Sequence, residues 1–358
     1  MTFESYVIDY IEGRRKNSFI RGFLYGISLF FHLGCKIRHC CYDYGIFKSY
    51  KVAPPVISVG NLVAGGTGKT PFVEMLVKEL SLKVPSIAII ARGYRSTKEK
   101  GSGVYQVSKG EGPLLPIDIC GDESYWLAKK TQASIWVGKD RVASARLAAK
   151  QGSHLIILED GLQHRRLKRD KEIILLHAAD LFGKGHFLPR GYLRDLPIRL
   201  EKADFIIVTH LEEGPAKEEI LLQIRAFSKA PVIGFSTHYV LQENIAGVKI
   251  GAFCGIAKPE FFYKALQDLG GELIETFTSK DHILPSQNEL EAFGKQCKQK
   301  QAMCLITTEK DDVKLGVNQV AGIPVFVLKM EFKCVWNKNL WQELCQSMLI
   351  GINHDGRI

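Results

Sequence analysis

The run GGTGKT, from Gly65 to Thr70, constrains the fold most, because it lies between an apolar segment, VISVG, and an amphipathic segment, PFVEMLVKEL. A strand, a glycine-rich turn and a helix in this order are typical of the phosphate-binding loop of α/β nucleotide-binding proteins. Glycines let backbone N–H groups turn toward a polyphosphate, Lys69 can reach the β and γ phosphates, and the Thr70 hydroxyl can ligate magnesium. The sequence therefore predicts a nucleoside triphosphate site formed by Val63, Ala64, Gly65, Gly66, Thr67, Gly68, Lys69 and Thr70.

The strict form of the motif, G-x-x-x-x-G-K-T, would place a glycine at position 63, where this chain has Val63. The alternative interpretation is a glycine-rich turn that has only a structural role. The preceding strand, the following helix and the pair Lys69 and Thr70 favour the nucleotide site.

A second apolar segment, SHLIILEDG, ends in the carboxylates Glu159 and Asp160. In phosphate-loop proteins, a carboxylate at the end of a neighbouring strand orients magnesium or its water. We expect Thr70, Glu159 and Asp160 to be the metal ligands. The alternative is an acidic turn that is satisfied by solvent.

The remaining apolar runs predict a parallel α/β fold with a second, smaller unit. SIAIIA, EIILLHA and ADFIIVTH read as buried strands, and a later series, KIGAFCGI, AMCLITTEKDD and IPVFVLKM, reads as a separate sheet. We expect a phosphate-loop kinase-like parallel sheet with an N-terminal interfacial membrane helix and a smaller α/β domain. The predicted division is 1–45 (membrane-associated helical segment), 46–229 (nucleotide-binding core), 230–247 (linker strands) and 248–358 (C-terminal α/β domain).

The uncharged run from Gly22 to Cys35 predicts a helix that lies at a membrane surface. It has 14 residues, whereas about 20 are needed to cross a bilayer. Cations flank it, as expected for a helix that places aromatic side chains among acyl chains and charges at the headgroups. These cations are Arg14, Arg15, Lys16, Arg21, Lys36 and Arg38. The alternative is an ordinary core helix.

Composition indicates the class of partner and the compartment. The chain has 48 Lys and Arg against 38 Asp and Glu, a net charge of +10, which favours an anionic partner. Its nine cysteines show no Cys-x-x-Cys spacing, and Glu4, Asp9 and Glu12 argue against a cleavable signal, so we expect reduced cytoplasmic thiols. Cys35, His39, Cys40 and Cys41 come closest to a metal cluster, but adjacent cysteines on a helix point in different directions.

Several segments together resemble the tetraacyldisaccharide 4'-kinases of lipid A synthesis, over nearly the whole chain. They are PVISVGNLVAGGTGKTP, ARGYRS (91–96), GDE (121–123), VGKDR (137–141), LEDGLQHRRLKRD, LPRGYLRDLP (188–197), SKDH (279–282) and TTEKDDVK. The lack of a glycine at position 63 is ordinary in that family.

The resemblance implies an ATP- and Mg²⁺-dependent kinase, a transferase of lipid A biosynthesis. Such an enzyme moves the γ-phosphate of ATP to the 4' hydroxyl of a tetraacylated glucosamine disaccharide 1-phosphate and forms lipid IVA. The implied partners are this glycolipid and a membrane surface, with no nucleic acid and no obligate protein partner. The implied location is the cytoplasmic face of the inner membrane, as a peripheral or monotopic protein.

The resemblance also assigns roles to individual residues. Asp122 and His282 would act together on the sugar hydroxyl, with Lys69, Arg141 and Arg194 as the other catalytic groups. Asp195 would contact the nucleotide, and Tyr94 and His164 the substrate. Glu159 stands where many relatives have aspartate, and Asp195 where many have glutamate. Without the resemblance, Asp122 would be interpreted as a helix cap and His282 as a loop histidine. Arg141 and Arg194 would be interpreted as surface cations, and Tyr94 as a core residue.

Two other functions fit a phosphate loop. One is a nucleotide switch or assembly ATPase at a membrane, a class that commonly carries an extra lysine early in the loop, where this chain has Ala64. The other is a basic nucleic-acid-binding ATPase. The sequence gives this alternative no support, because it shows no arginine-rich aromatic platform.

Overall fold

The computed structural model describes residues 3–93, 101, 103–256, 259–279 and 285–349. The chain forms two compact units, of which the first comprises Met1–Thr237 with Phe332–Ile358 and the second His238–Glu331. The chain leaves the first unit within strand β8 (Val232–Val240) and returns to it within strand β13 (Ile323–Trp336).

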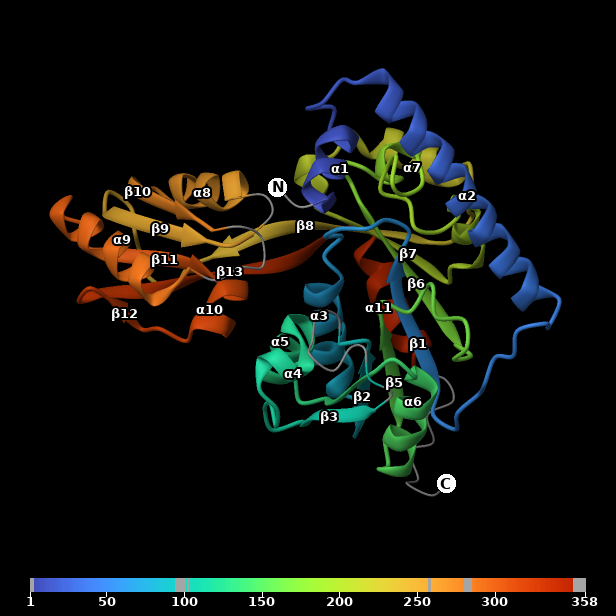
Figure 1. The fold of residues 1–358 in the computed structure, drawn as a ribbon. Helices are drawn as coiled ribbons and strands as arrows, with labels where there is room; N and C mark the ends of the chain where they lie inside the picture. Colours follow the sequence, from blue (N-terminus) through green and yellow to red (C-terminus); the bar gives the residue numbers. More distant parts are fainter. Residues whose placement is uncertain (1–2, 94–100, 102, 257–258, 280–284, 350–358) are drawn as a thin grey trace. The chain divides into compact units, whose positions relative to one another are not determined.

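The first unit is built on a sheet in which β1 (Val56–Asn61) lies between β5 (Leu155–Glu159) and β6 (Lys171–His177). The spatial order of its strands is β8-β7-β6-β1-β5-β2-β4-β3 (Figure 1). Among the described pairs of this unit, β3 and β4 are antiparallel and the others are parallel. The other strands are β2 (Ile87–Ala91), β3 (Val104–Lys109), β4 (Ser134–Gly138) and β7 (Phe205–Thr209).

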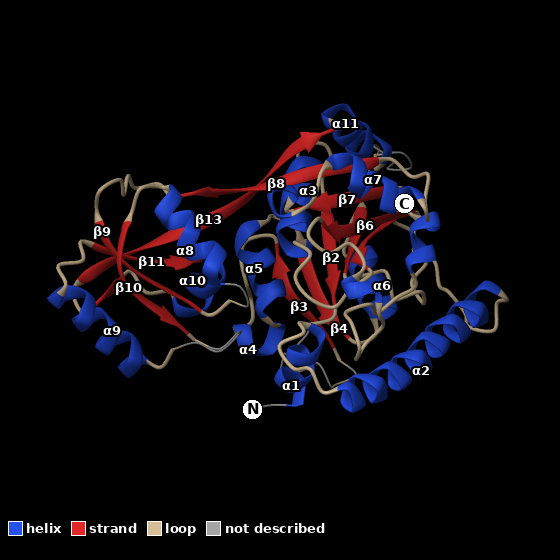
Figure 2. Ribbon diagram, turned by 90° about the horizontal axis from the view of Figure 1, so that it is seen from above, coloured by secondary structure: helices blue, strands red, loops and turns tan. Residues whose placement is uncertain are grey.

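Helices cover both faces of this sheet, which explains why its strands are apolar throughout. One face packs against α3 (Lys69–Ser81), α5 (Asp122–Lys130) and α11 (Lys338–Ser347), and the other against α6 (Arg141–Lys150) and α7 (Lys217–Arg225). Figure 2 shows these helices around the strands. The shorter elements are α4 (Ile117–Cys120), η1 (Gly183–Gly185), η2 (Pro197–Lys202) and η3 (Leu211–Glu213).

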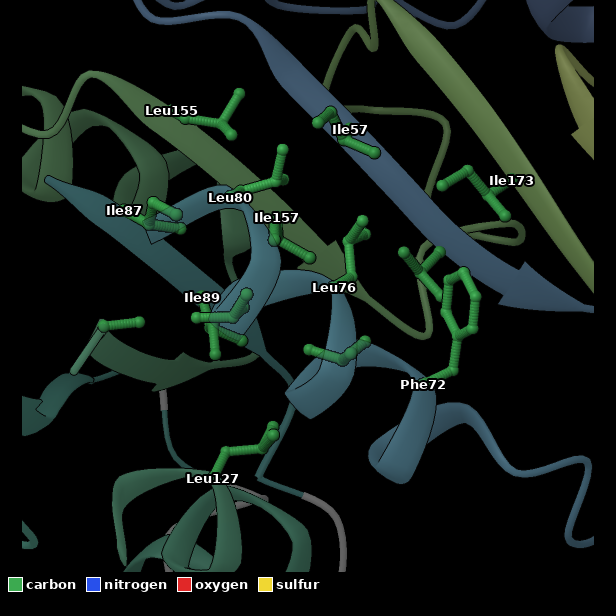
Figure 3. Close-up of a cluster of buried hydrophobic side chains, with 14 of the residues drawn as sticks. Ile57, Phe72, Leu76, Leu80, Ile87, Ile89, Leu127, Leu155, Ile157 and Ile173 are labelled. Atoms are coloured by element: carbon green, nitrogen blue, oxygen red, sulfur yellow. The ribbon is translucent and has the colours of Figure 1, made fainter. Parts of the chain in front are cut away.

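Helix α3, which follows the phosphate loop, is held against the sheet by its apolar side chains. Phe72, Leu76 and Leu80 recur at four-residue spacing and are buried against the sheet (Figure 3). They pack in the same cluster as Ile57 of β1 and Ile157 of β5. Each such buried side chain stabilises the fold by roughly 1.5–3 kcal/mol. This packing holds the N-terminus of α3 at the carboxyl ends of the central strands.

Two helices precede the sheet, α1 (Phe3–Ile11) and α2 (Ser18–Asp43). Asn17 caps α2 by accepting hydrogen bonds from the backbone N–H groups of Phe19 and Ile20, at 3.0 and 3.2 Å. With 26 residues, α2 is longer than the apolar run that predicted it. Within the described part of the chain, it is the one helix long and apolar enough to cross a membrane.

The second unit has its own parallel sheet, in the order β10-β9-β11-β13, with β12 added antiparallel to β13. Side chains of β9 alternate between two cores, one under α8 and one under α9. The elements are β9 (Lys249–Cys254), α8 (Pro259–Asp268), β10 (Glu272–Thr278), α9 (Gln287–Gln299), β11 (Cys304–Thr308), α10 (Glu309–Leu315) and β12 (Gln319–Val320).

The α/β fold class and the apolar N-terminal helix agree with the sequence analysis. The predicted segment 1–45 contains α1 and α2, and the predicted linker 230–247 contains β8. The predicted C-terminal domain 248–358 differs from the structure, because Phe332–Ile358 belongs to the first unit. Leu344 and Cys345 of α11 are buried in the same core as α3, a pairing that sequence order does not reveal.

Candidate active site

The phosphate loop lies between β1, which ends at Asn61, and α3, which begins at Lys69. Gly68 has a φ of 71°, and a Cβ there would lie 2.5 Å from a ring carbon of Phe332, so only glycine fits. The side chain of Asn61 donates to the Thr67 hydroxyl at 2.8 Å, and the Thr209 hydroxyl donates to the Thr67 carbonyl at 3.1 Å. These bonds brace the loop and leave Gly65 and Gly66 exposed.

The end of β5 supplies a carboxylate to this loop. Asp160 has a φ of 50°, and its Oδ1 lies 3.5 Å from Nζ of Lys69. Arg194 donates to both carboxylate oxygens, with Nη1 at 2.9 Å from Oδ2, and also to the side chain of Asn61. Burial opposes ionisation, but the charges of Lys69 and Arg194 hold the pKa of Asp160 below its usual range. Asp160 is therefore ionised at neutral pH.

Glu159 sits in a different environment, although it is adjacent in the chain. It is 8% exposed. Burial raises the pKa of its carboxyl to about 7, and the charge of Asp160 adds to the rise. An added cation would offset both effects, because it would favour the ionised form of Glu159.

Arg141 holds the end of β5 in place. It is the first residue of α6, which Asp140 caps, and it is buried. Its Nη1 donates to the carbonyl oxygens of Glu159 and Asp160, at 3.2 and 2.8 Å. Burial lowers the pKa of the guanidinium, but arginine keeps its charge at physiological pH. These contacts give Arg141 a structural role, and its catalytic role stays a prediction.

His164 follows in the same turn, where its N–H donates to the carbonyl of Gly161 at 2.8 Å. Burial, together with the charge of Arg141, lowers the pKa of its imidazole to about 3. The ring is therefore neutral at pH 7. Its Nε2 is buried and has no hydrogen-bond partner within the described structure, so a substrate group that bonds to this atom would satisfy it.

The basic run after His164 is divided between internal contacts and solvent. Arg165 donates to Asp43 at 2.6 Å, and Arg169 donates to Glu172 at 2.6 Å. Arg166 and Lys168 are exposed. Arg166 also lies 3.9 Å from Asp140, but a surface pair of this kind is weak and leaves the guanidinium accessible to an anionic ligand.

Asp122 is the first residue of α5, and Gly121, with a φ of 84°, holds the cap position before it. A carboxylate in the first turn of a helix is stabilised by the helix dipole. Tyr94 and His282 lie outside the described residues. The pairing of Asp122 with His282 and the role of Tyr94 stay predictions.

The carboxylate of Asp195 is engaged by side chains of α2 and by Gln163. It is fully buried, and its Oδ1 lies 2.5 Å from Nε2 of His39 on α2. Arg38 and Gln163 contact its Oδ2 at 3.5 and 3.4 Å. Direct nucleotide contact by Asp195 stays a prediction, and this geometry supports a positioning role instead.

The sequence analysis did not select a group at the carboxyl ends of β6 and β7, formed by His177, His210 and Glu213. The signal was available, since His177 directly follows an apolar run and His210 follows another with only Thr209 between. The two imidazole rings stack at 4.4 Å with 13° between their planes. The nitrogen lone pairs of stacked imidazole rings lie in parallel planes, so at least one ring would have to rotate before both could bind one metal ion. The arrangement is not preorganised for a metal.

The fold and the loop define a phosphate-loop nucleotide-binding protein. A sequence model of the family "Tetraacyldisaccharide-1-P 4'-kinase" matches residues 20–349. The tetraacyldisaccharide 4'-kinase of Chlamydia trachomatis is 34% identical over 301 residues, covering 81% of this chain and 80% of the relative. The enzyme of the same name from Halothermothrix orenii is 31% identical over 361 residues, covering 92% and 94%. The solved structure of LpxK from Aquifex aeolicus in complex with ATP is 29% identical, with a TM-score of 0.74, and covers 92% of this chain and 99% of that one.

The chain belongs to the tetraacyldisaccharide-1-P 4'-kinase family. It is therefore a kinase. The comparisons do not favour the alternative of a nucleotide switch or assembly ATPase.

Proposed function

We propose that this kinase transfers the γ-phosphate of ATP to the 4' hydroxyl of a tetraacyldisaccharide 1-phosphate, which forms lipid IVA. The contact of Lys69 and Arg194 with the Asp160 carboxylate beside the phosphate loop carries the proposal. Two cations and a carboxylate beside the N-terminus of α3 suit the terminal phosphates of a triphosphate bound there. The family and the ATP complex of the related structure support the same reaction.

Thr70, Glu159 and Asp160 are the residues that would hold Mg²⁺. The donor set fits, because hydroxyl and carboxylate oxygens are the ligands that magnesium prefers. The raised pKa of Glu159, caused by burial and by Asp160, also fits, since a divalent cation would compensate two adjacent negative charges. When bound, the ion supplies charge neutralisation to the transferring phosphate.

The protein's own groups position and neutralise the phosphates. The exposed glycines of the loop present backbone N–H groups to the anion, and Lys69 supplies a charge at its terminal phosphates. Arg194 is held by Asp160 and Asn61, so its guanidinium is fixed before substrate binds. Arg141 keeps the Asp160 backbone in its left-handed conformation. Phosphoryl transfer depends mainly on such positioning and neutralisation.

At the acceptor end, Asp122 and His282 would activate the sugar hydroxyl. A neutral imidazole accepts the hydroxyl proton, and a carboxylate fixes its tautomer and stabilises the imidazolium that forms. His164, which is neutral at pH 7, and Tyr94 would contact the glycolipid. The assignment of Asp122 and His282 rests on the family motifs GDE and SKDH, that of Tyr94 on ARGYRS and that of His164 on LEDGLQHRRLKRD.

We propose that α2 lies along the cytoplasmic surface of the inner membrane rather than crossing it. One side of the helix packs on the protein through Leu24, Ser28, Cys35 and His39. The opposite side exposes large apolar residues: Phe19 at 85%, Phe23 at 64%, Phe30 at 76%, Leu33 at 53% and Ile37 at 54%. A helix that crossed a bilayer would have to abandon the first set of contacts. Acyl chains at an interface would cover the second set.

Product analysis tests the reaction. The full chain is incubated with ATP, Mg²⁺ and a tetraacyl disaccharide 1-phosphate, and the lipid is examined by mass spectrometry for one added phosphate at the 4' position. Lys69→Ala serves as the negative control and should lower the rate on the order of a hundredfold or more. An unmodified lipid, or ATP hydrolysis that ignores the lipid, would refute the proposed function.

A further inference from the structure

Residues 192–195, here called the strap, pair with the backbone of the phosphate loop. The N–H of Ala64 donates to the carbonyl of Tyr192 at 2.7 Å, and the N–H of Arg194 donates to the carbonyl of Leu62 at 2.8 Å. Val63 and Leu193 face each other as an antiparallel bridge. One side of the strap is thus part of the wall of the nucleotide site, and Arg194 projects from it onto Asp160.

The other side of the strap is held by the N-terminal helices. The hydroxyl of Tyr192 donates to Glu12 at 2.7 Å, and its ring packs against the apolar cluster of α1 and α2. The thiol of Cys35 lies 3.7 Å from the carbonyl of Arg194. His39 contacts the carboxylate of Asp195 at 2.5 Å. The contacts from α2 therefore reach Arg194 and its neighbour directly.

The bond between His39 and Asp195 is oriented by a third residue. Arg165 donates to Nδ1 of His39 at 3.1 Å and to Asp43 at 2.6 Å. Because Nδ1 accepts, Nε2 of His39 carries the hydrogen and donates to Asp195. Asp195 is 0% exposed and His39 is 5% exposed. Removing one partner of such a buried pair leaves the other without compensation.

We propose that His39 and Asp195 form a positioning pair through which α2 fixes Arg194 at the phosphate loop. The N-terminal helix is then a component of the catalytic machinery as well as a membrane anchor. This inference rests on the proposed function of the same site.

Membrane anchoring by α2 and positioning of Arg194 by α2 predict different turnover on an acceptor that is dispersed in detergent. If α2 only anchored the protein, loss of the His39 contact would leave turnover on a detergent-dispersed acceptor unchanged. If α2 positions Arg194, the same change lowers turnover there, because displacement of a charged group by about 1 Å can cost on the order of a hundredfold in rate.

The experiment compares the full chain with His39→Ala, His39→Gln and Cys40→Ala. Cys40 is exposed and adjacent on the same helix, so it is the matched control. The acceptor is a tetraacyl disaccharide 1-phosphate in detergent micelles, and kcat is expressed per nucleotide site, counted with a fluorescent ATP analogue. We expect His39→Ala to lower kcat about 10- to 100-fold, with the KM for ATP changed less. His39→Gln, whose amide can donate to Asp195, should recover most of the lost kcat. The kcat of Cys40→Ala should equal that of the parent chain.

Two further measurements test the positioning role of α2 independently of the kinase reaction. Sedimentation with anionic vesicles should be the same for His39→Ala and the parent within about twofold, because the exposed apolar side of α2 is unchanged. Amide hydrogen exchange of residues 62–68 should be faster in His39→Ala. A His39→Ala variant with parental kcat and parental loop exchange would overturn the inference. If the parent chain phosphorylates no acceptor, the proposed function fails, and loop exchange alone decides whether α2 positions the loop.

Discussion

Arg194 and Asp160 form a two-point ion pair at the phosphate loop, although they are 34 residues apart in the chain. Nη1 of Arg194 lies 2.9 Å from Oδ2 of Asp160, and Nη2 contacts Oδ1 and the side chain of Asn61. Lys69 approaches the same carboxylate at 3.5 Å. One carboxylate, itself partly exposed, thus holds two cations close to the N-terminus of α3.

Replacing Arg194 tests the value of that geometry. Arg194→Lys keeps the charge but loses the planar fork that bonds to Asp160 and Asn61 together. We expect kcat to fall on the order of a hundredfold, since a fixed donor to developing charge is worth about that much. Steady-state kinetics with the tetraacyl acceptor gives the measurement, and Arg146→Ala, at an exposed position on α6, is the control. Equal turnover in Arg194→Lys and the parent would mean that charge alone suffices.

Two glycines of the loop, Gly66 and Gly68, should respond differently to alanine. Gly68 has a φ of 71° and an added Cβ would meet Phe332 at 2.5 Å, whereas a Cβ on Gly66 has nothing within 4 Å. Gly68→Ala should therefore cost about 2–3 kcal/mol and lower Tm by roughly 5–10 °C. Gly66→Ala should shift Tm by no more than about 2 °C. Thermal unfolding without nucleotide measures both, and similar Tm values for the two variants would contradict the loop conformation.

Glu159 should make stability depend on pH. Burial and the charge of Asp160 raise its pKa from 4.5 to about 7 in the folded chain. Between these values the folded state binds more protons than the unfolded state, so stability falls as pH rises from 4.5 to 7 and the loss is constant above. Glu159→Gln removes this loss. We expect the Tm of Glu159→Gln, relative to that of the parent, to increase between pH 5 and pH 8. The corresponding gain in the free energy of unfolding is at most about 3 kcal/mol. A difference in Tm that is independent of pH would show that Glu159 is ionised throughout.

The exposed side of α2 should control membrane binding. Phe23→Ser with Phe30→Ser removes two aromatic side chains, 64% and 76% exposed, and leaves the side that packs on the protein intact. Because each phenylalanine is worth roughly 1.5–3 kcal/mol when buried, vesicle partition should fall at least about tenfold. Leu82→Ser, at an exposed leucine that follows α3, is the matched control. Deletion of the whole helix would be a poorer test, because His39 would be lost with it. Unchanged sedimentation of the double variant would refute the interfacial role.

Features encoded by neighbouring residues were predictable from the sequence. The β1, loop and α3 unit follows from an apolar run, glycines and helical spacing within residues 56–81, and the acids at 159 and 160 follow from their place after a buried strand. The role of Asp195 was not predictable, since its partner His39 is 156 residues away and lies in a helix that reads as a membrane segment. Sequence order likewise assigned α11 to the second unit, whereas its apolar side belongs to the core of the first.

The last prediction concerns Asp122 and His282, of which only Asp122 lies in the described part of the chain. A sugar hydroxyl is a weak nucleophile, and a histidine near neutral pKa can accept its proton if a carboxylate orients the ring. The transition state of phosphoryl transfer is loose and asks little of a base, so each alanine substitution should lower kcat by roughly 10²- to 10⁴-fold with little change in nucleotide affinity. Groups that act as a unit give non-additive losses. We therefore expect Asp122→Ala combined with His282→Ala to be scarcely worse than the more damaging single variant. Losses in kcat that multiply in the double variant would refute the dyad and give each residue a separate role.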